Sequence, residues 1–264
     1  MARRARFAGV LTALALAWAG ACAAAPAAAA ERPFSDWAAV VVAGDYHAHN
    51  GGDSEAFDNA RRDVSRELRR LGFKAENLRQ FSVRPERYRD TQPLKTDPQA
   101  IYETLKDISD RTQGGCLVYF TSHGAPNGVL VDQVILTPRI LGQMLDASCG
   151  AKPTVVVMSA CFSGVFVKPM AEPNRMILTA ARPDRTSFGC GEDDKYPYFD
   201  DCLLQSTPKA ADFAALGKSV QACVAAREIQ EGMKPPSEPQ LWVGPQLRPM
   251  LPLLPFANGP PRAD

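Results

Sequence analysis

A histidine and a cysteine each follow a short hydrophobic run, and their chemistry can be interpreted from this spacing. The run at 117–120 leads through Thr-Ser to His123, and the run at 155–158 leads through Ser-Ala to Cys161. A nearby imidazole can take the proton of a thiol, and the resulting thiolate is the reactive nucleophile. This pair therefore indicates nucleophilic catalysis by cysteine, provided that the fold brings the two side chains together.

The two hydrophobic runs have the composition of buried strands in a parallel sheet, in which Val, Leu, Ile and aromatic residues are nearly continuous. Ligands and reactive groups collect at the carboxyl ends of such strands, so His123 and Cys161 are expected at one edge of the sheet. Gly124 has no side chain to block its backbone N–H group. The amides of Gly124 and Cys161 are candidates for an oxyanion hole, where each donor contributes about 3 kcal/mol.

The rest of the chain alternates between strand-like and helix-like patterns, which predicts the α/β class with a mostly parallel sheet. A helix after Ser54 places apolar residues on one face up to Leu71, and Gly72 ends it. A short hairpin is expected over 129–136. The other predicted strands lie at 38–44, within 73–83, at 154–160, 176–181 and 240–243, and the other helices at 97–108, 137–147 and 209–231.

The N-terminal segment has the pattern of an export signal. Arginines at positions 3, 4 and 6 precede an apolar, Ala-rich stretch that ends with Ala28-x-Ala30. The alternative is an uncleaved membrane anchor, but Pro26 and the many alanines disfavour a stable membrane helix. We therefore predict a signal peptide at 1–30, one folded domain at 31–250, and a poorly ordered Pro-rich tail at 251–264. The mature protein would be periplasmic or secreted, without a membrane span.

Charge and cysteine content restrict the function further. The chain has 30 Lys and Arg against 29 Asp and Glu, and no basic stripe suggests nucleic-acid binding. Export permits disulfides, but if Cys161 stays reduced, one more cysteine must also remain free. Cys190 and Cys202 are one candidate pair, and no C-x-x-C spacing indicates a metal or redox motif. The cysteines after residue 30 are Cys116, Cys149, Cys161, Cys190, Cys202 and Cys223.

The cysteine segment resembles the legumain family of asparaginyl endopeptidases, peptidase family C13. Residues 159–164 read Ser-Ala-Cys-Phe-Ser-Gly, where the family has Glu-Ala-Cys-Glu-Ser-Gly. Residues 121–124 read Thr-Ser-His-Gly, similar to the family's motif ending in Asp-His-Gly. Fainter similarity at 179–183 and at 187–190 extends the resemblance, which covers about residues 38–201.

This resemblance implies a caspase-like three-layer α/β/α fold with a six-stranded sheet, five strands of which are parallel. It implies that Cys161 is the nucleophile and His123 the general acid and base of a cysteine endopeptidase. The thiolate would attack a peptide carbonyl to form a thioester, which water or an amine then resolves. The substrate would be a peptide or protein, and no metal or organic cofactor is required.

The resemblance also implies a substrate pocket, but with departures from the family pattern. The family lines its asparagine pocket with an Arg-His pair and with a Glu two residues before the nucleophile. Phe57-Asp58 and Ser159 occupy these places here. Thr186, Ser187 and Asp201 match further pocket residues. A pocket without arginine does not favour an acidic side chain, so asparagine or another small polar residue is expected next to the cleaved bond.

Two alternatives remain at this point. His47 and His49 follow the first predicted strand, and together with His123 they could bind zinc in a metal-dependent hydrolase. The chain could also be a non-catalytic caspase-like module that binds peptides without cleaving them. The His123 and Cys161 pair favours the peptidase over both alternatives.

Overall fold

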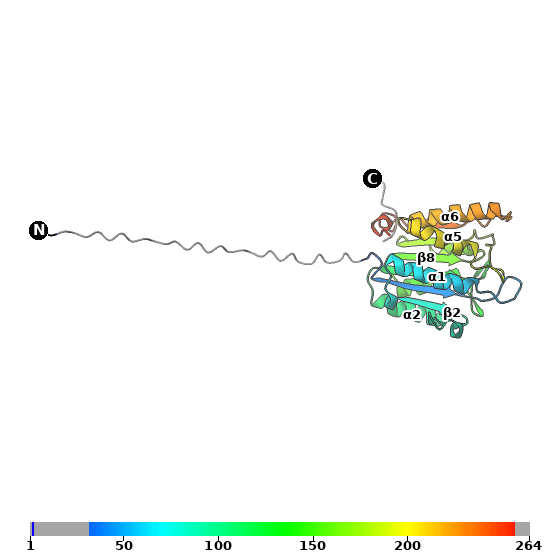
Figure 1. Ribbon diagram of the computed structural model, residues 1–264, viewed down its shortest axis with the longest axis horizontal. Helices are drawn as coiled ribbons and strands as arrows, with labels where there is room; N and C mark the ends of the chain where they lie inside the picture. The colour runs from blue at the N-terminus through cyan, green and yellow to red at the C-terminus, as the bar shows by residue number, and fades with distance from the viewer. Residues whose placement is uncertain (1, 3–31, 257–264) are drawn as a thin grey trace. The chain divides into compact units, whose positions relative to one another are not determined.

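The computed structural model describes residue 2 and residues 32–256, and a central twisted sheet runs through the latter segment (Figure 1). Its strand order is β10-β9-β8-β4-β1-β2-β3, and only β10 runs antiparallel to its neighbour. The strands are β1 (Trp37–Ala43), β2 (Leu78–Ser82), β3 (Leu94–Lys95), β4 (Gly115–Thr121), β8 (Thr154–Ser159), β9 (Arg175–Thr179) and β10 (Gln240–Val243).

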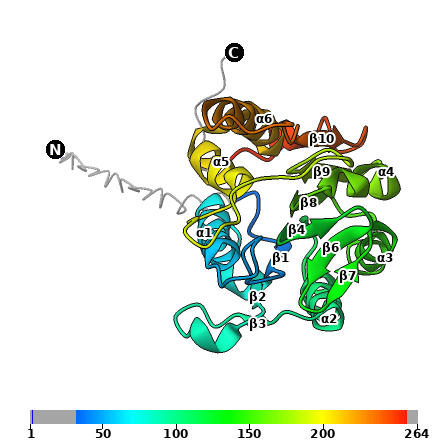
Figure 2. The same ribbon diagram turned by 90° about the vertical axis from the view of Figure 1, so that its right-hand side faces the viewer.

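Helices cover both faces of this sheet and make three layers (Figure 2). One face packs against α1, α5 and α6, and the other against α2, α3 and α4. Each face of the sheet has its own apolar cluster, because successive strand residues point to opposite faces. The helices are α1 (Ala56–Leu71), α2 (Pro98–Asp110), α3 (Pro138–Ser148), α4 (Val167–Met170), α5 (Tyr198–Ser206) and α6 (Phe213–Gln230).

The central strands are buried from end to end, as expected for a parallel sheet with helices on both faces. Every residue of β1 and β4 is buried, and so is every residue of β8. A second, three-stranded sheet follows β4 and contains the predicted hairpin. It consists of β5 (Gly124–Ala125), β6 (Gly128–Val131) and β7 (Val134–Leu136).

The predicted α/β class with a mostly parallel sheet is confirmed, with one strand more than the six expected. The additional strand, β3, has two residues and lies at the sheet edge, too short for a hydrophobic pattern to reveal it. The sequence pattern does not predict α5, which begins after Pro197 in a polar region and has two acidic residues in its first turn. No helix within residues 32–256 is long and apolar enough to cross a bilayer.

The expectation of a poorly ordered tail is wrong for residues 251–256. Leu251–Leu253 form a short 3₁₀ helix, and Leu251 and Phe256 are buried in the core under α6. Phe256 packs edge-to-face on Phe213, which explains why a Pro-rich segment is held in place here. Apart from residue 2, the predicted signal peptide lies outside the described residues, as do residues 257–264, and the domain boundaries remain predictions.

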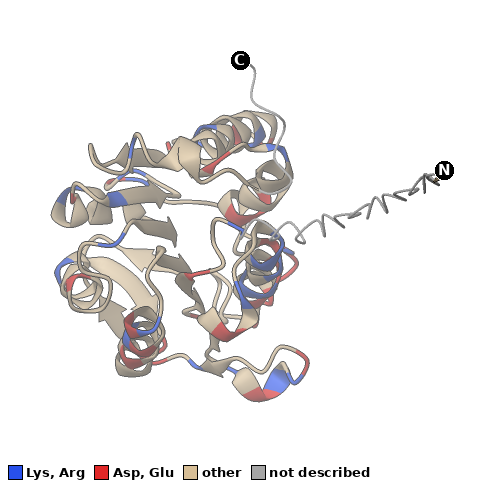
Figure 3. Ribbon diagram, turned by 90° about the vertical axis from the view of Figure 1, so that its left-hand side faces the viewer, with Lys and Arg blue, Asp and Glu red and all other residues tan. Residues whose placement is uncertain are grey.

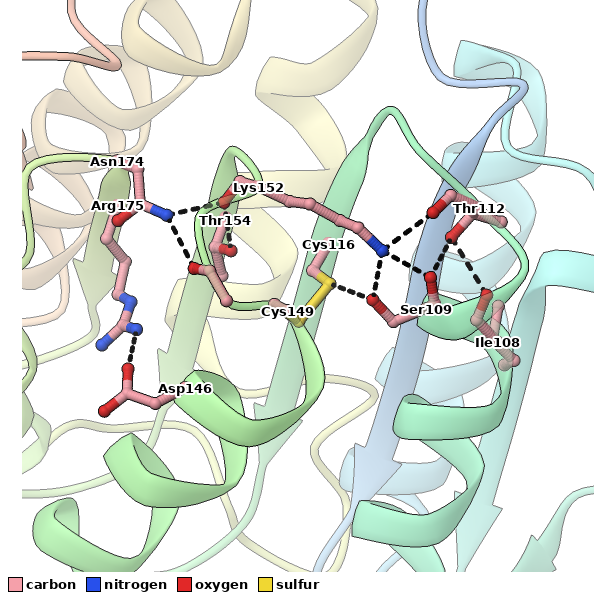
Figure 4. The surroundings of a disulfide bond; sticks show 11 residues. Ile108, Ser109, Thr112, Cys116, Asp146, Cys149, Lys152, Thr154, Asn174 and Arg175 are labelled. Atoms are coloured by element: carbon pink, nitrogen blue, oxygen red, sulfur yellow. Dashed lines mark hydrogen bonds and ion pairs between the residues drawn. A yellow bond between two sulfur atoms is a disulfide. The ribbon is translucent and has the colours of Figure 1, made fainter.

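Two disulfides join cysteines that are 33 and 21 positions apart in the sequence. Cys116 at the start of β4 is bonded to Cys149 after α3, and Cys202 of α5 to Cys223 of α6. The candidate Cys190–Cys202 pair is therefore not formed, and Cys161 and Cys190 are both free thiols. Figure 4 shows Lys152 beside the first disulfide, where its ammonium group donates to the Thr112 carbonyl at 2.8 Å, near the C-terminal end of α2.

We expect replacement of both Cys116 and Cys149 by alanine to lower the free energy of unfolding by about 3–4 kcal/mol. The bond closes a loop of 33 residues, and loop closure of this size restricts the unfolded chain by about that amount. Denaturant titrations of the wild type and the double variant measure the difference. Replacing the free thiol of Cys190 by alanine is the control, and equal losses for both variants would contradict the prediction.

Candidate active site

The sheet brings the predicted histidine and cysteine to one edge. Strands β4 and β8 are neighbouring and parallel, with Thr121 opposite Ser159. His123 lies two residues after Thr121, and Cys161 lies two residues after Ser159. Both therefore leave the sheet at the same level. The Ser122 amide donates to the Ser159 carbonyl at 3.0 Å, which extends the contact between the two chains beyond the strands.

The two loops then touch through their backbones at Gly124 and Cys161. A Cβ atom placed on Gly124 would lie 1.9 Å from the carbonyl oxygen of Cys161 and 3.0 Å from its nitrogen. No side chain fits into this space, which explains why a glycine follows the histidine. The loops that carry His123 and Cys161 therefore meet at the carboxyl ends of β4 and β8.

The ring of His123 is oriented by a carbonyl from another loop. Its Nε2 atom lies 2.9 Å from the carbonyl oxygen of His47, in the loop after β1. A carbonyl only accepts hydrogen bonds, so Nε2 carries the proton in the neutral ring, and Nδ1 is the atom that can accept one. Phe57, at the start of α1, packs edge-on against the imidazole, with ring centroids 5.2 Å apart.

Cys161 lies in a sharp turn between β8 and the following 3₁₀ helix. The next residue, Phe162, has φ 57°, a left-handed conformation that is uncommon for an aromatic residue and turns the chain away from the sheet. The Ser187 amide donates to Sγ of Cys161 at 3.3 Å, and the Ser187 hydroxyl lies 3.6 Å away. The thiol of Cys161 also donates to the Ser187 carbonyl at 3.6 Å, so the sulfur is held against Ser187.

His123 and Cys161 line the same cavity, whose volume is about 410 Å³. This is within the size range of sites that hold small molecules or single side chains. The described lining contains one carboxylate, Asp194, and neither lysine nor arginine. The other lining residues are His49, Thr186, Ser187, Phe188, Gly189, Cys190, Gly191, Tyr198 and Met233.

Of the predicted pocket residues, Thr186 and Ser187 line this cavity, whereas Ser159 and Asp201 do not. Ser159 is buried at the end of β8, and its hydroxyl donates to Asp200 at 2.6 Å. Asp201 is the residue after Asp200 in α5, and it pairs with Arg227 of α6. The structure therefore corrects the assignment of Ser159 and Asp201 to the cavity surface.

The pair Phe57-Asp58, which stands where the resemblance places Arg-His, also presents no charge to the cavity. Phe57 contacts the ring of His123 as described above. Asp58 is buried and accepts from Arg61 at 2.7 Å and from Ser82 at 3.1 Å. Its carboxylate is therefore used inside α1 and β2, away from the cavity.

Asp200 holds together the ends of the two strands that carry His123 and Cys161. Besides Ser159 of β8, its carboxylate accepts from Thr121 of β4 at 3.0 Å and from the hydroxyl of Tyr119. The side chain is fully buried, and burial raises the pKa of Asp200 from 3.8 to about 7, despite the hydrogen bonds that lower it. Asp200 contacts the strand ends and does not line the cavity.

This raised pKa predicts a pH dependence of stability. The folded protein keeps the Asp200 proton up to about pH 7, whereas the unfolded chain releases it above pH 3.8. The stabilisation of the folded state by this proton is therefore complete below pH 3.8. It is lost as the pH rises through about 7. We expect the unfolding free energy of the wild type, relative to Asp200→Asn, to fall over this range and then level off. Denaturant titrations at pH 4 to 8 test this, and a constant difference would refute it.

Three cavity residues have roles that sequence reasoning did not anticipate. Asp194 accepts from the Gly191 amide at 2.7 Å through Oδ2, and Tyr198 is covered by Arg227, 3.9 Å from its ring centroid. Burial, with the neighbouring Cys161, raises the pKa of the Cys190 thiol to about 11. The polar loop 182–198 gave no periodic signal that could have placed these residues.

The three histidines of the zinc alternative do not form a ligand set. The Nδ1 atom of His47 is 2.7 Å from Asp45, and the ring of His123 is bonded to the His47 carbonyl. Only His49 and His123 line the cavity. Within the described segment, no group of three or more His, Cys, Asp or Glu side chains is arranged to hold a metal ion.

Comparison with solved structures identifies the fold. The chain is similar to caspase-1 from Spodoptera frugiperda, with a TM-score of 0.56 and 15% sequence identity. The match covers 81% of this chain and 88% of the caspase chain. The protein therefore has the caspase-like α/β fold, in which a mostly parallel sheet is flanked by helices. No curated protein matches the sequence closely enough to count as a relative.

The sequence also matches a family model over residues 75–235, which includes both predicted reactive residues. The chain belongs to the peptidase C13 family, as the two short motifs indicated. Family and fold together make it a cysteine peptidase that acts on protein substrates.

Proposed function

We propose that the protein is an endopeptidase that cleaves peptide bonds with a Cys161–His123 dyad. The observation that carries the proposal is the backbone contact of Gly124 with Cys161, which holds both loops against one cavity. His123 takes the thiol proton at Nδ1, because Nε2 is bonded to the His47 carbonyl. The thiolate attacks the peptide carbonyl and forms a thioester, while the imidazolium gives its proton to the leaving amine.

The backbone amides of Gly124 and Cys161 stabilise the negative oxygen of the tetrahedral intermediate in this proposal. Leu130 donates to the His123 carbonyl, which leaves Gly124 at a non-hydrogen-bonded position of the β5–β6 ladder. Within residues 32–256, the Cys161 amide donates to no backbone acceptor outside the regular ladders. The proposal is supported by two amides without backbone acceptors on loops that touch each other, because an oxyanion hole needs unpaired N–H donors.

Alkylation with iodoacetamide, followed by peptide mapping, tests this mechanism. We expect activity to fall as the label appears on Cys161, and a peptide substrate to protect it. Cys190 is an internal control in the same cavity, because its raised pKa of about 11 keeps it protonated at neutral pH. Loss of activity with a chelator but not with the alkylating agent would refute the thiol mechanism and support a metal-dependent one.

For specificity, we propose that the cavity accepts a side chain with N–H donors before the cleaved bond and rejects an acidic one. Asp194 is the only carboxylate in the described lining, and its Oδ2 is already bonded to the Gly191 amide. Oδ1 is then available to accept from a substrate, and the hydroxyls of Thr186 and Ser187 lie in the same cavity. Asparagine and basic residues satisfy this arrangement, whereas aspartate meets a like charge.

We expect Asp194→Asn to reduce the preference for lysine over aspartate before the cleaved bond by about 10- to 100-fold. A partly buried like-charge or opposite-charge contact of this kind contributes about 1–3 kcal/mol. Matched fluorogenic peptides with Asn, Lys or Asp at this position measure kcat/KM for the wild type and the variant. Asp193→Asn, a neighbouring exposed carboxylate outside the lining, is the control. An unchanged ratio in Asp194→Asn would contradict the assignment.

We further propose that the protein is exported to the periplasm or the medium. The basic and Ala-rich start of the sequence supports this, and so do the two disulfides, because such bonds persist mainly in oxidising compartments. N-terminal sequencing of the protein isolated from cell fractions tests the proposal. A chain that starts at Glu31 in the exported fraction is expected, and an uncleaved chain confined to the cytoplasm would refute it.

A further inference from the structure

A second large cavity lies along α1, and the peptidase mechanism does not use it. Its volume is about 430 Å³, close to that of the cavity at Cys161. It lies between the outer side of α1, the strand β2 and the loop before β3. Five of its eight lining residues are arginines. The lining residues are Arg32, Arg62, Ser65, Arg66, Arg69, Arg70, Gln80 and Thr91.

The positive charge of this cavity is only partly compensated. Asp63 pairs with Arg62 and Arg66, and Glu67 pairs with Arg70. Arg32 and Arg69 have no acidic partner among the residues that the structure describes. Among the described residues, the cavity lining contains no acidic residue. Figure 3 shows the basic and acidic segments close together on α1.

Two neutral side chains of the cavity, Gln80 and Thr91, have their oxygens bonded to a buried arginine. Arg61 is fully buried, and its Nη1 donates to the side-chain oxygens of Gln80 and Thr91. Because these oxygens are occupied, the Gln80 amide N–H groups and the Thr91 hydroxyl proton remain available to a ligand. The Nη2 atom of Arg61 is itself buried without a hydrogen-bond partner. A recess lined by cations and free donors favours an anion.

The size and spacing of the arginines indicate an anion with more than one charged group. Arg62 and Arg69 are seven residues apart on α1, or about 10 Å along the helix axis, so the basic lining is longer than a single phosphate group. Guanidinium groups match phosphate oxygens through paired N–H donors. We propose that this cavity binds a soluble small molecule that carries two or more phosphate groups.

Isothermal titration of the protein isolated from the exported fraction with tripolyphosphate, at low salt, tests this proposal. We expect one site per chain in the wild type. Arg69→Gln and Arg32→Gln are each expected to weaken binding about tenfold, and the double variant about a hundredfold, as for the loss of charge-assisted hydrogen bonds. Both side chains are exposed, so the variants keep the core intact, which circular dichroism and thermal unfolding check.

The matched control is Arg139→Gln, an exposed arginine on α3 outside this cavity. This variant removes the same charge from the protein and is expected to bind tripolyphosphate as the wild type does. Absence of binding, or equal weakening by Arg139→Gln and Arg69→Gln, would overturn the proposal. Binding of a triglutamate peptide but not tripolyphosphate would assign the cavity to acidic peptides instead. Binding only to phosphatidylglycerol vesicles would assign it to a membrane surface.

Discussion

Replacing Cys161 with alanine is expected to reduce kcat by at least about 10,000-fold and to leave the fold intact. The sulfur is the atom that forms the thioester in the proposed mechanism, and alanine offers no nucleophile in its place. The side chain is only partly buried, and its contacts are weak hydrogen bonds with Ser187, so little stability depends on it. Initial rates with a fluorogenic peptide, together with thermal unfolding, measure both effects.

His123→Ala should cause a similar loss in kcat. The effects of replacing two residues that act as one unit are not additive. The double variant is therefore expected to be about as inactive as either single variant. Cys190→Ala provides the matched comparison, since it removes the other free thiol of the same cavity and should change kcat by less than about tenfold. If Cys161→Ala kept substantial activity while His123→Ala did not, the nucleophile would have to be another group.

Gly124→Ala is expected to lower kcat/KM by about 100-fold or more, although alanine adds a single methyl group. This methyl would lie 1.9 Å from the carbonyl oxygen of Cys161, so the two loops must separate. Displacement of about 1 Å in a site of this kind costs roughly two orders of magnitude in rate. The same strain should lower the unfolding free energy by about 1–3 kcal/mol.

Gly142→Ala is the matched control for this substitution. Gly142 lies within α3, and a Cβ there would meet only Met170, at an ordinary distance of 3.7 Å. Alanine is preferred over glycine inside a helix by about 1 kcal/mol, so this variant should be as stable as the wild type or more so. Equal activity of Gly124→Ala and Gly142→Ala would show that the loop contact does not position the reaction.

The positions of His123 and Cys161 could be predicted because they depend on local patterns. Continuous hydrophobic runs identified β4 and β8 as buried strands, and parallel neighbouring strands must end at the same edge. Both predicted catalytic residues follow these runs after two further residues. The predicted hairpin at β6 and β7 was confirmed for the same reason, since its turn and alternation lie within a few residues.

The pocket could not be predicted in the same way, because it depends on contacts between distant segments. Tyr119 and Val157 belong to the apolar layer under α1 and α5, and Thr121 and Ser159 continue the same faces of their strands. Their shared partner, Asp200, lies on α5, which the sequence pattern did not reveal. Adjacent residues on a helix point about 100° apart, so Asp201 turns toward α6 instead.

The two disulfides have a consequence for the covalent connectivity of the chain. One bond lies entirely before the loop 182–197 that lines the cavity, and the other lies entirely after it. A single cut in this loop would therefore give two polypeptides with no covalent link between them. Only non-covalent packing, including the pairing of β10 with β9, would then hold the fragments together. Such a nicked enzyme would migrate as two bands in denaturing gels, whether or not a reductant is added.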